Sequence, residues 1–232
     1  FSEGHVPGAI WLDPDALRAT VEGVEGQVAP RTTVETWLSD AGLAAYDPVV
    51  VVGDTNDTTP ARVAWTLMHY GHEAPVSLLD GGMLAWAGAG HDQTADDFPR
   101  GTAGYLGAAT REALRVDRAW VLAHLGDPAV VFFDVRTDEE FEQGHLPGAR
   151  NVNWTYNLRR DGLFMEAEDV RALHGEPTQA TLVVYCRTGS RAAVSWALLR
   201  AAGYDDVRLY DGSWAEWGAD PETPKEEGPA RQ

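Results

Sequence analysis

The chain has 232 residues, which is enough for one large domain or two small ones. Hydrophobic residues make up 44% of it, and this content excludes a disordered or fibrous protein. Asp and Glu outnumber Lys and Arg by 36 to 18, for a formal charge of -18, so neither nucleic acid nor an anionic membrane is expected as a partner.

Cys186 is the only cysteine in the sequence. An intramolecular disulfide is therefore impossible, and a cysteine-based metal cluster is excluded. No apolar run approaches the roughly 20 residues that span a bilayer, and residues 1–20 do not show the charged segment followed by a hydrophobic run that is typical of a signal peptide. A soluble protein in the reducing cytoplasm is the simplest expectation.

A nine-residue motif occurs twice in the chain. Residues 1–9 read FSEGHVPGA and residues 141–149 read FEQGHLPGA, with six identical positions. Further matches follow in the same order, namely residues 49–52 with 182–185, Trp65 with Trp196, residues 79–82 with 210–213, and Trp86 with Trp217. This order indicates two tandem copies of a domain of roughly 110 residues.

Short apolar runs alternate with amphipathic stretches in both copies, which is typical of an α/β domain with a mainly parallel sheet flanked by helices. In the second copy the pattern predicts strands at 129–133, 181–185 and 207–210, and a helix at 191–202 that ends at Gly203. We therefore expect two tandem α/β domains.

The first domain is expected at residues 1–110, with a Gly- and Asp-rich linker at about 88–110, and the second at 111–232. A polar, frayed tail is expected from about residue 221. Phe141 follows a predicted strand that ends near Asp134, whereas no residue precedes Phe1. The first domain is thus expected to lack its first strand in this chain.

The sequence Cys186-Arg-Thr-Gly-Ser-Arg191 lies between a predicted strand and a predicted helix. A short glycine-containing loop turns backbone N–H groups inward, and the helix N-terminus adds positive potential. Together with Arg187 and Arg191, these groups favour the thiolate form of Cys186, the condition for a nucleophilic cysteine. The alternative is an inert buried thiol, which is the usual state of a free cysteine.

Four motifs occur in a fixed order, namely Asp134-Val-Arg136, the Gly144–Gly148 sequence GHLPG, the Tyr185–Arg191 sequence YCRTGSR, and Tyr210-Asp-Gly-Ser213 with Trp217. They resemble the successive motifs of a rhodanese domain. Because a degenerate set occurs in the first half, the chain is similar to the tandem-domain rhodaneses, which comprise thiosulfate and 3-mercaptopyruvate sulfurtransferases. The resemblance implies a sheet of parallel strands wrapped by helices in each half, and a single active site in the second.

The resemblance also implies a mechanism. The Cys186 thiolate attacks the outer sulfur of thiosulfate, sulfite leaves, and the resulting persulfide passes its sulfur to cyanide, a thiol or a dithiol in a ping-pong cycle. No metal or organic cofactor is needed. The alternative donor is 3-mercaptopyruvate, and a second alternative is a non-catalytic sulfur carrier or interaction module.

Loop length separates sulfur from phosphorus chemistry. Arg191 follows Cys186 in a Cys-x4-Arg pattern. Cysteine phosphatases and arsenate reductases share a Cys-x5-Arg loop, which is one residue longer. The shorter loop forms a narrower cradle, which suits a persulfide sulfur better than a phosphoryl group.

The residues expected to bind substrate along the loop are Arg187, Thr188, Gly189, Ser190 and Arg191. Arg187 resembles the arginine that follows the cysteine in thiosulfate-using members of the family. Glu140 stands where several tandem members carry a substrate-binding arginine. Asp134 and Arg136 are expected to pair and to support the end of their strand under the loop.

The first copy has no cysteine, and Asp54 or Thr55 is expected at the cysteine position. Asp54 and Asp57 would repel an anion there, so this copy is expected to be catalytically inactive. His5 and His145 belong to the repeated motif of both copies, which favours a structural role for them. From residue 177 to 204 there is no acidic residue, and this acid-free window contains Cys186.

Overall fold

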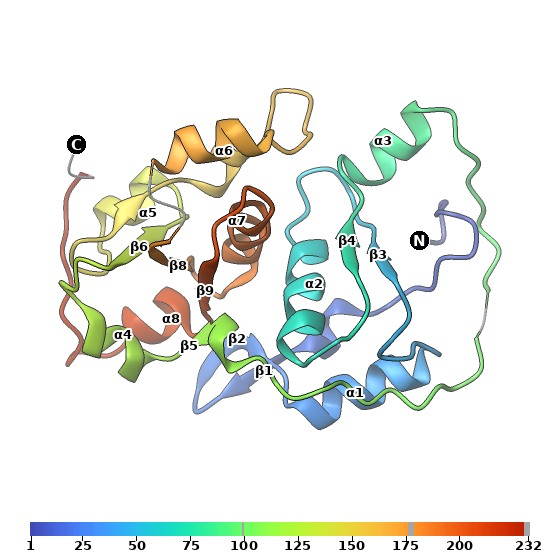
Figure 1. Ribbon diagram of the computed structural model, residues 1–232, viewed down its shortest axis with the longest axis horizontal. Helices are drawn as coiled ribbons and strands as arrows, with labels where there is room; N and C mark the ends of the chain where they lie inside the picture. Colours follow the sequence, from blue (N-terminus) through green and yellow to red (C-terminus); the bar gives the residue numbers. More distant parts are fainter. Residues whose placement is uncertain (99, 176–178, 230–232) are drawn as a thin grey trace. The chain divides into compact units, whose positions relative to one another are not determined.

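The computed structural model describes residues 1–98, 100–175 and 179–229 (Figure 1). The chain forms two compact units. Unit 1 consists of Phe1–Ala19 and Val28–Arg111, and unit 2 consists of Thr20–Gln27 and Glu112–Gln232. Residues 20–27 thus pack within unit 2, although the sequence assigns them to the first domain. None of the described helices has the length and apolar character needed to cross a membrane.

A parallel βαβ motif forms the centre of unit 1. β3 (Val49–Val51) pairs in parallel with β4 (Val76–Leu78), and α2 (Thr59–His69) connects them. Trp65 on α2 is fully buried, as expected for one of the tryptophans shared by both copies. The other elements are a 3-10 turn (Pro14–Leu17), α1 (Arg31–Asp40) and α3 (Gly82–Gly88).

A β-hairpin joins the two stretches of unit 1. Its strands β1 (Arg18–Val21) and β2 (Val24–Val28) pair across a two-residue turn. The turn residues Glu22 and Gly23 both have positive φ, at 51° and 84°, as a type I′ hairpin turn requires. The chain therefore reverses direction tightly at this point, and the turn end of the hairpin belongs to unit 2.

Unit 2 contains a five-stranded parallel sheet with the order β5-β9-β8-β6-β7. Its strands are β5 (Arg115–Val116), β6 (Val130–Asp134), β7 (Arg150–Asn151), β8 (Thr181–Tyr185) and β9 (Asp206–Tyr210). Because all strands run in one direction, their carboxyl ends meet at the same edge of the sheet. The central strand, β8, leads directly into Cys186.

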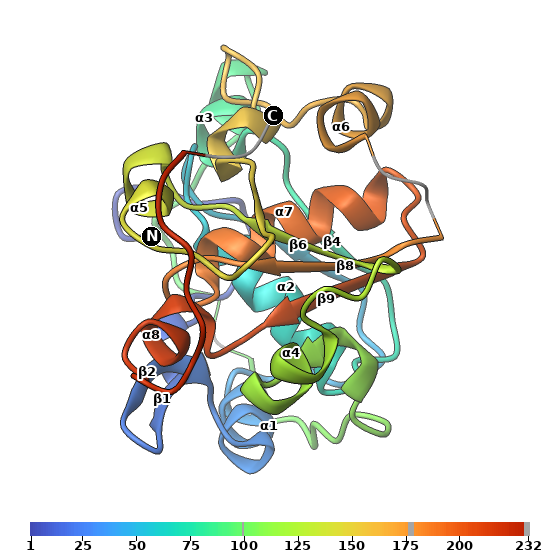
Figure 2. The same ribbon diagram turned by 90° about the vertical axis from the view of Figure 1, so that its left-hand side faces the viewer.

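Helices cover both faces of this sheet (Figure 2). α6 and α7 lie on one face and α4 and α8 on the other, with bounds α4 (Arg118–His124), α6 (Ala167–His174), α7 (Ser190–Ala201) and α8 (Ser213–Trp217). Alternate residues of β8 point to opposite faces. Val183 and Tyr185 accordingly pack with Val121 of α4 and Trp217 of α8 in one buried cluster. The mixed α/β fold and its parallel sheet are those predicted.

The predicted elements of the second copy lie within one residue of β6, β8, β9 and α7. Over residues 221–229 the expectation of a frayed tail is wrong, because this segment packs within unit 2, and residues 230–232 lie outside the described residues. Thr223 is 5% exposed and donates to the carbonyl of Trp217 at 2.6 Å, and Glu226 forms an antiparallel bridge with His145. The polar side chains of this segment find partners in the body of the unit, which hydropathy alone does not reveal.

The repeated nine-residue motif forms the same turn in both units. His5 Nδ1 lies 3.0 Å from the carbonyl of Phe1, and His145 Nδ1 lies 2.9 Å from that of Phe141. Each imidazole stacks on its phenylalanine, with ring centroids 3.6 Å apart and planes 9° from parallel. These shared contacts favour the structural role predicted for the two histidines.

Candidate active site around Cys186

Cys186 lies at the carboxyl edge of the unit 2 sheet, directly after the central strand. Asp134 at the end of β6 and Ser213 after β9 lie at the same edge. In parallel α/β sheets this edge is where ligands bind. Cys186 itself is 1% exposed.

The loop after Cys186 directs backbone donors toward the sulfur. Gly189 donates its N–H to the Cys186 Sγ at 3.1 Å, and α7 begins at the next residue, Ser190. Gly189 has a φ of 87°, a conformation that glycine adopts without strain. The sulfur therefore lies at the N-terminal end of a 12-residue helix, where negative charge is stabilised.

The start of α8 holds the other side of the loop. Trp214 N–H donates to the carbonyl of Cys186 at 3.0 Å, and Ala215 N–H donates to that of Arg187 at 2.9 Å. Ser213 Oγ accepts the Cys186 N–H at 3.3 Å and donates to the Tyr210 carbonyl at 2.8 Å. Two loop carbonyls and the cysteine amide are thus fixed by α8. Sequence reasoning did not single out Ser213 as a site residue, although the Tyr210–Ser213 motif includes it.

Arg191 and Glu140 form a two-point ion pair beside the cysteine. The Nη1 and Nη2 atoms of Arg191 donate to Glu140 at 2.6 and 2.9 Å. These hydrogen bonds lower the pKa of Glu140 to about 2 despite partial burial. They also raise the pKa of Arg191, and its interaction with the Cys186 thiol adds to this shift. Arg191 thus faces Glu140 and the sulfur together.

Glu140 is held from a second direction by α5 (Asp138–Glu142). Its carboxylate accepts the Thr137 N–H at 3.2 Å, and Thr137 Oγ1 accepts the Glu140 N–H at 3.2 Å. This reciprocal arrangement is a capping box, which fixes the first turn of a helix. In the structure, Glu140 orients Arg191.

Asp134 and Arg136 form the expected pair, and both are buried, at 0% and 2% exposure. Arg136 Nη2 lies 2.5 Å from Asp134 Oδ2 and donates to the Gly144 carbonyl at 2.6 Å. The ring of Trp214 covers the guanidinium, with its centroid 4.5 Å from Cζ. These contacts connect β6, the repeated turn and α8, which favours a supporting role for the pair.

The side chain of Arg187 points away from the buried part of the loop. It is 67% exposed, and its Nη2 lies 3.6 Å from Glu25 Oε1 in the hairpin. Thr188 is half-buried beside Gly26 of the same hairpin. Ser190 is 8% exposed, in the first turn of α7. Sequence reasoning missed Glu25 and Gly26, because their contacts lie about 160 positions away in the chain.

Unit 1 has glycine at the position of the cysteine. Val51 pairs with Leu78 as Val184 pairs with Leu209, so Gly53 corresponds to Cys186. The hydrogen bonds agree, because Met83 N–H donates to the Gly53 carbonyl at 2.9 Å as Trp214 does to Cys186. The expectation of Asp54 or Thr55 at this position is wrong, because the loop before α2 is longer than its counterpart.

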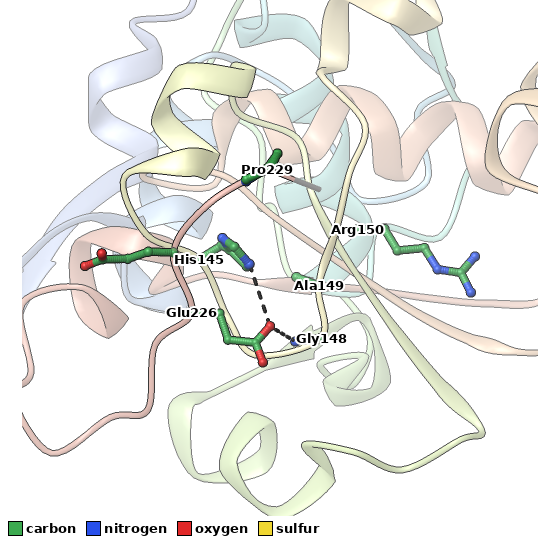
Figure 3. Close-up of a pocket in the computed structure, with 7 residues that line it drawn as sticks. His145, Gly148, Ala149, Arg150, Glu226 and Pro229 are labelled. Carbon is green, nitrogen blue, oxygen red and sulfur yellow. Dashed lines mark hydrogen bonds and ion pairs between the residues drawn. The ribbon is translucent and has the colours of Figure 1, made fainter. Parts of the chain in front are cut away.

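A cavity of about 520 Å³ lies elsewhere in unit 2, next to the repeated turn (Figure 3). Glu226 accepts the Gly148 N–H at 3.1 Å at its wall, and its Oε2 lies 3.8 Å from His145 Nε2. No residue of the Cys186 loop lines this cavity. Among the residues that the structure describes, no group of three His, Cys, Asp or Glu side chains is arranged to hold a metal ion.

The model of the rhodanese-like domain matches residues 1–89 and 117–220. A protein of Saccharopolyspora erythraea named "Putative thiosulfate sulfurtransferase" is 32% identical, over 98% of this chain and 88% of its own length. A protein of Pseudomonas aeruginosa named "Probable 3-mercaptopyruvate sulfurtransferase" is 33% identical, over 97% and 84%. The sulfur carrier protein TtuD of Thermus thermophilus is 32% identical, over 94% and 84%.

Among solved structures, the anaerobic ergothioneine biosynthesis enzyme of Chlorobium limicola, in complex with trimethyl histidine, matches with a TM-score of 0.88 and 26% identity. The match covers 98% of this chain but 61% of that one, so the chain spans less than two thirds of the solved enzyme. The family model covers both halves, and the relatives of Saccharopolyspora erythraea and Pseudomonas aeruginosa carry sulfurtransferase names. On these matches the chain belongs to the rhodanese-like sulfurtransferases, in their tandem-domain form.

Proposed function

We propose that this protein transfers the outer sulfur of thiosulfate to a thiophilic acceptor through a persulfide on Cys186. The observation that supports this most directly is the hydrogen bond from Gly189 N–H to the Cys186 Sγ, at the N-terminus of α7 and next to Arg191. Such donors stabilise the thiolate that attacks and the persulfide anion that follows. Arg187, next in sequence, is 67% exposed and thus accessible to a donor in solvent.

In the first half-reaction, the Cys186 thiolate forms a bond to the outer sulfur of thiosulfate. The bond from that sulfur to the sulfite sulfur breaks, and its electron pair leaves with sulfite. In the second half-reaction, cyanide attacks the terminal sulfur of the persulfide, thiocyanate leaves, and the Cys186 thiolate is regenerated. A thiol acceptor takes the sulfur in the same way, and neither half-reaction needs an external oxidant.

Each residue of the site has a proposed part in this cycle. Cys186 is the nucleophile, and Gly189 with the first turn of α7 stabilises negative charge on its sulfur. Arg191 supplies a fixed positive charge beside that sulfur, and Glu140 positions it. Arg187 binds the sulfonate end of the donor. Asp134 and Arg136 support the loop through their buried pair.

The second candidate donor is 3-mercaptopyruvate, which the name of the Pseudomonas aeruginosa relative favours. Its carboxylate could use the same arginine as the sulfonate of thiosulfate. Arg187 itself favours thiosulfate, because thiosulfate-using members resemble this chain at that position. With either donor the thiolate attacks the sulfur that is transferred, and the leaving group is sulfite from thiosulfate or the enolate of pyruvate from 3-mercaptopyruvate.

Intact mass measurement tests the proposal, because Cys186 is the single thiol of the chain. Reduced protein incubated with thiosulfate should gain one sulfur, about 32 mass units, and cyanide should remove it. Cys186→Ser should show neither the gain nor turnover, with an unchanged circular dichroism spectrum. A gain of mass with 3-mercaptopyruvate alone would identify that compound as the donor in place of thiosulfate. No gain with either compound would overturn the proposal.

A further inference from the structure

The turn end of the hairpin places an acidic residue on the Cys186 loop. Glu25 Oε1 lies 3.6 Å from Arg187 Nη2, and both side chains are about two-thirds exposed, at 65% and 67%. Residues 20–27 and 187 belong to the same compact unit. Glu25 therefore neutralises the exposed arginine that follows the cysteine.

The neighbouring residue of the hairpin packs closely on the same loop. A Cβ placed on Gly26 would lie 2.8 Å from the Cβ of Thr188, so only a glycine lets the hairpin pack this closely against the Thr188 side chain. Behind this contact, Gln27 Oε1 accepts a hydrogen bond of 2.9 Å from Arg115 Nη2. Arg115 in turn donates to Asp211 at 3.2 Å, near the end of β9. Three successive hairpin residues, Glu25, Gly26 and Gln27, therefore contact unit 2, and the contacts of the last two hold Glu25 next to Arg187.

The two arginines of the loop differ in how firmly they are paired. Arg191 is held by two hydrogen bonds to Glu140 and is 24% exposed, so its partner stays in place. Arg187 has a longer and far more exposed ion pair with Glu25. Exposed pairs of this kind are weak and are readily replaced by another anion. An anionic donor that approaches the loop can therefore displace Glu25 from Arg187.

We propose that Glu25 is a specificity-determining residue that competes with the anionic group of the sulfur donor for Arg187. The carboxylate of Glu25 occupies the place that the sulfonate of thiosulfate would take at this arginine. Its effect is to weaken the binding of anions at the loop and to leave the attack by Cys186 unchanged. This inference rests on the proposed function for its substrate, but its electrostatic part can be measured without any sulfur donor.

Alkylation of the single cysteine measures the electrostatic part. Iodoacetate is an anion and iodoacetamide is neutral. The ratio of their alkylation rates with Cys186 therefore measures how strongly the loop attracts or repels a negatively charged reagent. Glu25→Gln should raise the iodoacetate-to-iodoacetamide ratio about two- to fivefold at low salt, and the increase should vanish at high salt. Glu25→Asp retains the charge and should return the ratio to that of the wild type.

Glu22→Gln is the matched control, because Glu22 is an exposed residue of the same hairpin and the net charge changes equally. This variant should leave the ratio unchanged. An unchanged ratio in Glu25→Gln, or an equal rise in both variants, would overturn the proposal.

Steady-state kinetics with thiosulfate separate this inference from the proposed function. Glu25→Gln should lower KM about two- to fivefold and leave kcat unchanged, because an interaction made equally in the ground and transition states affects binding alone. A fall in kcat with no change in KM would contradict competition for Arg187. Absence of turnover in the wild type, with the alkylation ratio still raised by Glu25→Gln, would reject thiosulfate as donor and retain the role of Glu25.

Discussion

Glu140 and Arg191 join α5 to the first turn of α7 by two hydrogen bonds, of 2.6 and 2.9 Å. Glu140 is itself fixed by the capping box with Thr137, so the guanidinium has a rigid support. Arg191 also interacts with the Cys186 thiol. The charge beside the sulfur is therefore placed by a residue on a different helix.

Glu140→Gln should slow the formation of the Cys186 persulfide roughly tenfold, because a neutral amide holds Arg191 less firmly than a carboxylate does. Single-turnover mass measurement after mixing with thiosulfate gives this rate. Glu142→Gln changes an exposed residue of the same helix by the same charge and should have the wild-type rate. Equal rates in all three proteins would show that Arg191 keeps its position without Glu140.

Local sequence pattern was sufficient to predict the segment that carries the site. The run 182–185 consists of four apolar residues and the following helix has a regular period, and both elements lie within one residue of their predicted bounds. The Asp134–Arg136 pair was also predicted, since a single residue separates its members in the sequence. The role of Glu140 was not, because it depends on how α5 is oriented against α7.

Contacts between distant segments account for the remaining differences. The hairpin turn meets the Cys186 loop across some 160 positions, and no periodicity in residues 20–27 signals this contact. The residue matching Cys186 in unit 1 was predicted one or two positions too late, because the loop before α2 is longer than the loop before α7 and the repeated residues alone do not place the extra ones. Strand register and the Met83 hydrogen bond identify Gly53 directly.

Gly26→Ala should reduce sulfur transfer about fivefold, because the new methyl group would press on Thr188 in the Cys186 loop. Gly26 has a φ of 78°, so the substitution also strains the backbone by about 1 kcal/mol. Gly23→Ala separates the two effects, since Gly23 has a φ of 84° and nothing within 4 Å of its Cβ position. Both variants should lose similar thermal stability, and only Gly26→Ala should lose persulfide formation. Equal rates of persulfide formation would show that the hairpin contact has no influence on the loop.

His174 should make the protein less stable in mild acid. Burial lowers the pKa of His174 to about 4, and the side chain is 3% exposed, with Nε2 3.1 Å from Asn157 Oδ1. The unfolded chain binds the proton more readily, near pH 6.5, so this destabilisation begins below pH 6.5 and is complete near pH 4. It amounts to about 3 kcal/mol at most.

Urea unfolding at pH 7 and at pH 4.5 checks this prediction. His174→Gln retains a donor toward Asn157 and cannot titrate, so its loss of stability between the two pH values should be smaller than that of the wild type. Identical losses in the two proteins would assign the acid sensitivity to other groups.

Turnover at low thiosulfate concentration should rise modestly with ionic strength. The chain carries a formal charge of -18, which repels a dianion over distances that salt screens. The acid-free window from 177 to 204 offers less compensation for this charge than its three arginines suggest, because Arg187 is paired with Glu25 and Arg191 with Glu140.

Initial rates at a donor concentration well below KM, measured over a series of KCl concentrations, give the dependence of turnover on ionic strength. KCl is the appropriate salt, because sulfate would itself compete for the loop. A steep fall in rate would mean that the loop arginines attract the donor despite their partners, whereas a rise that disappears in Glu25→Gln would place the repulsion at the hairpin turn.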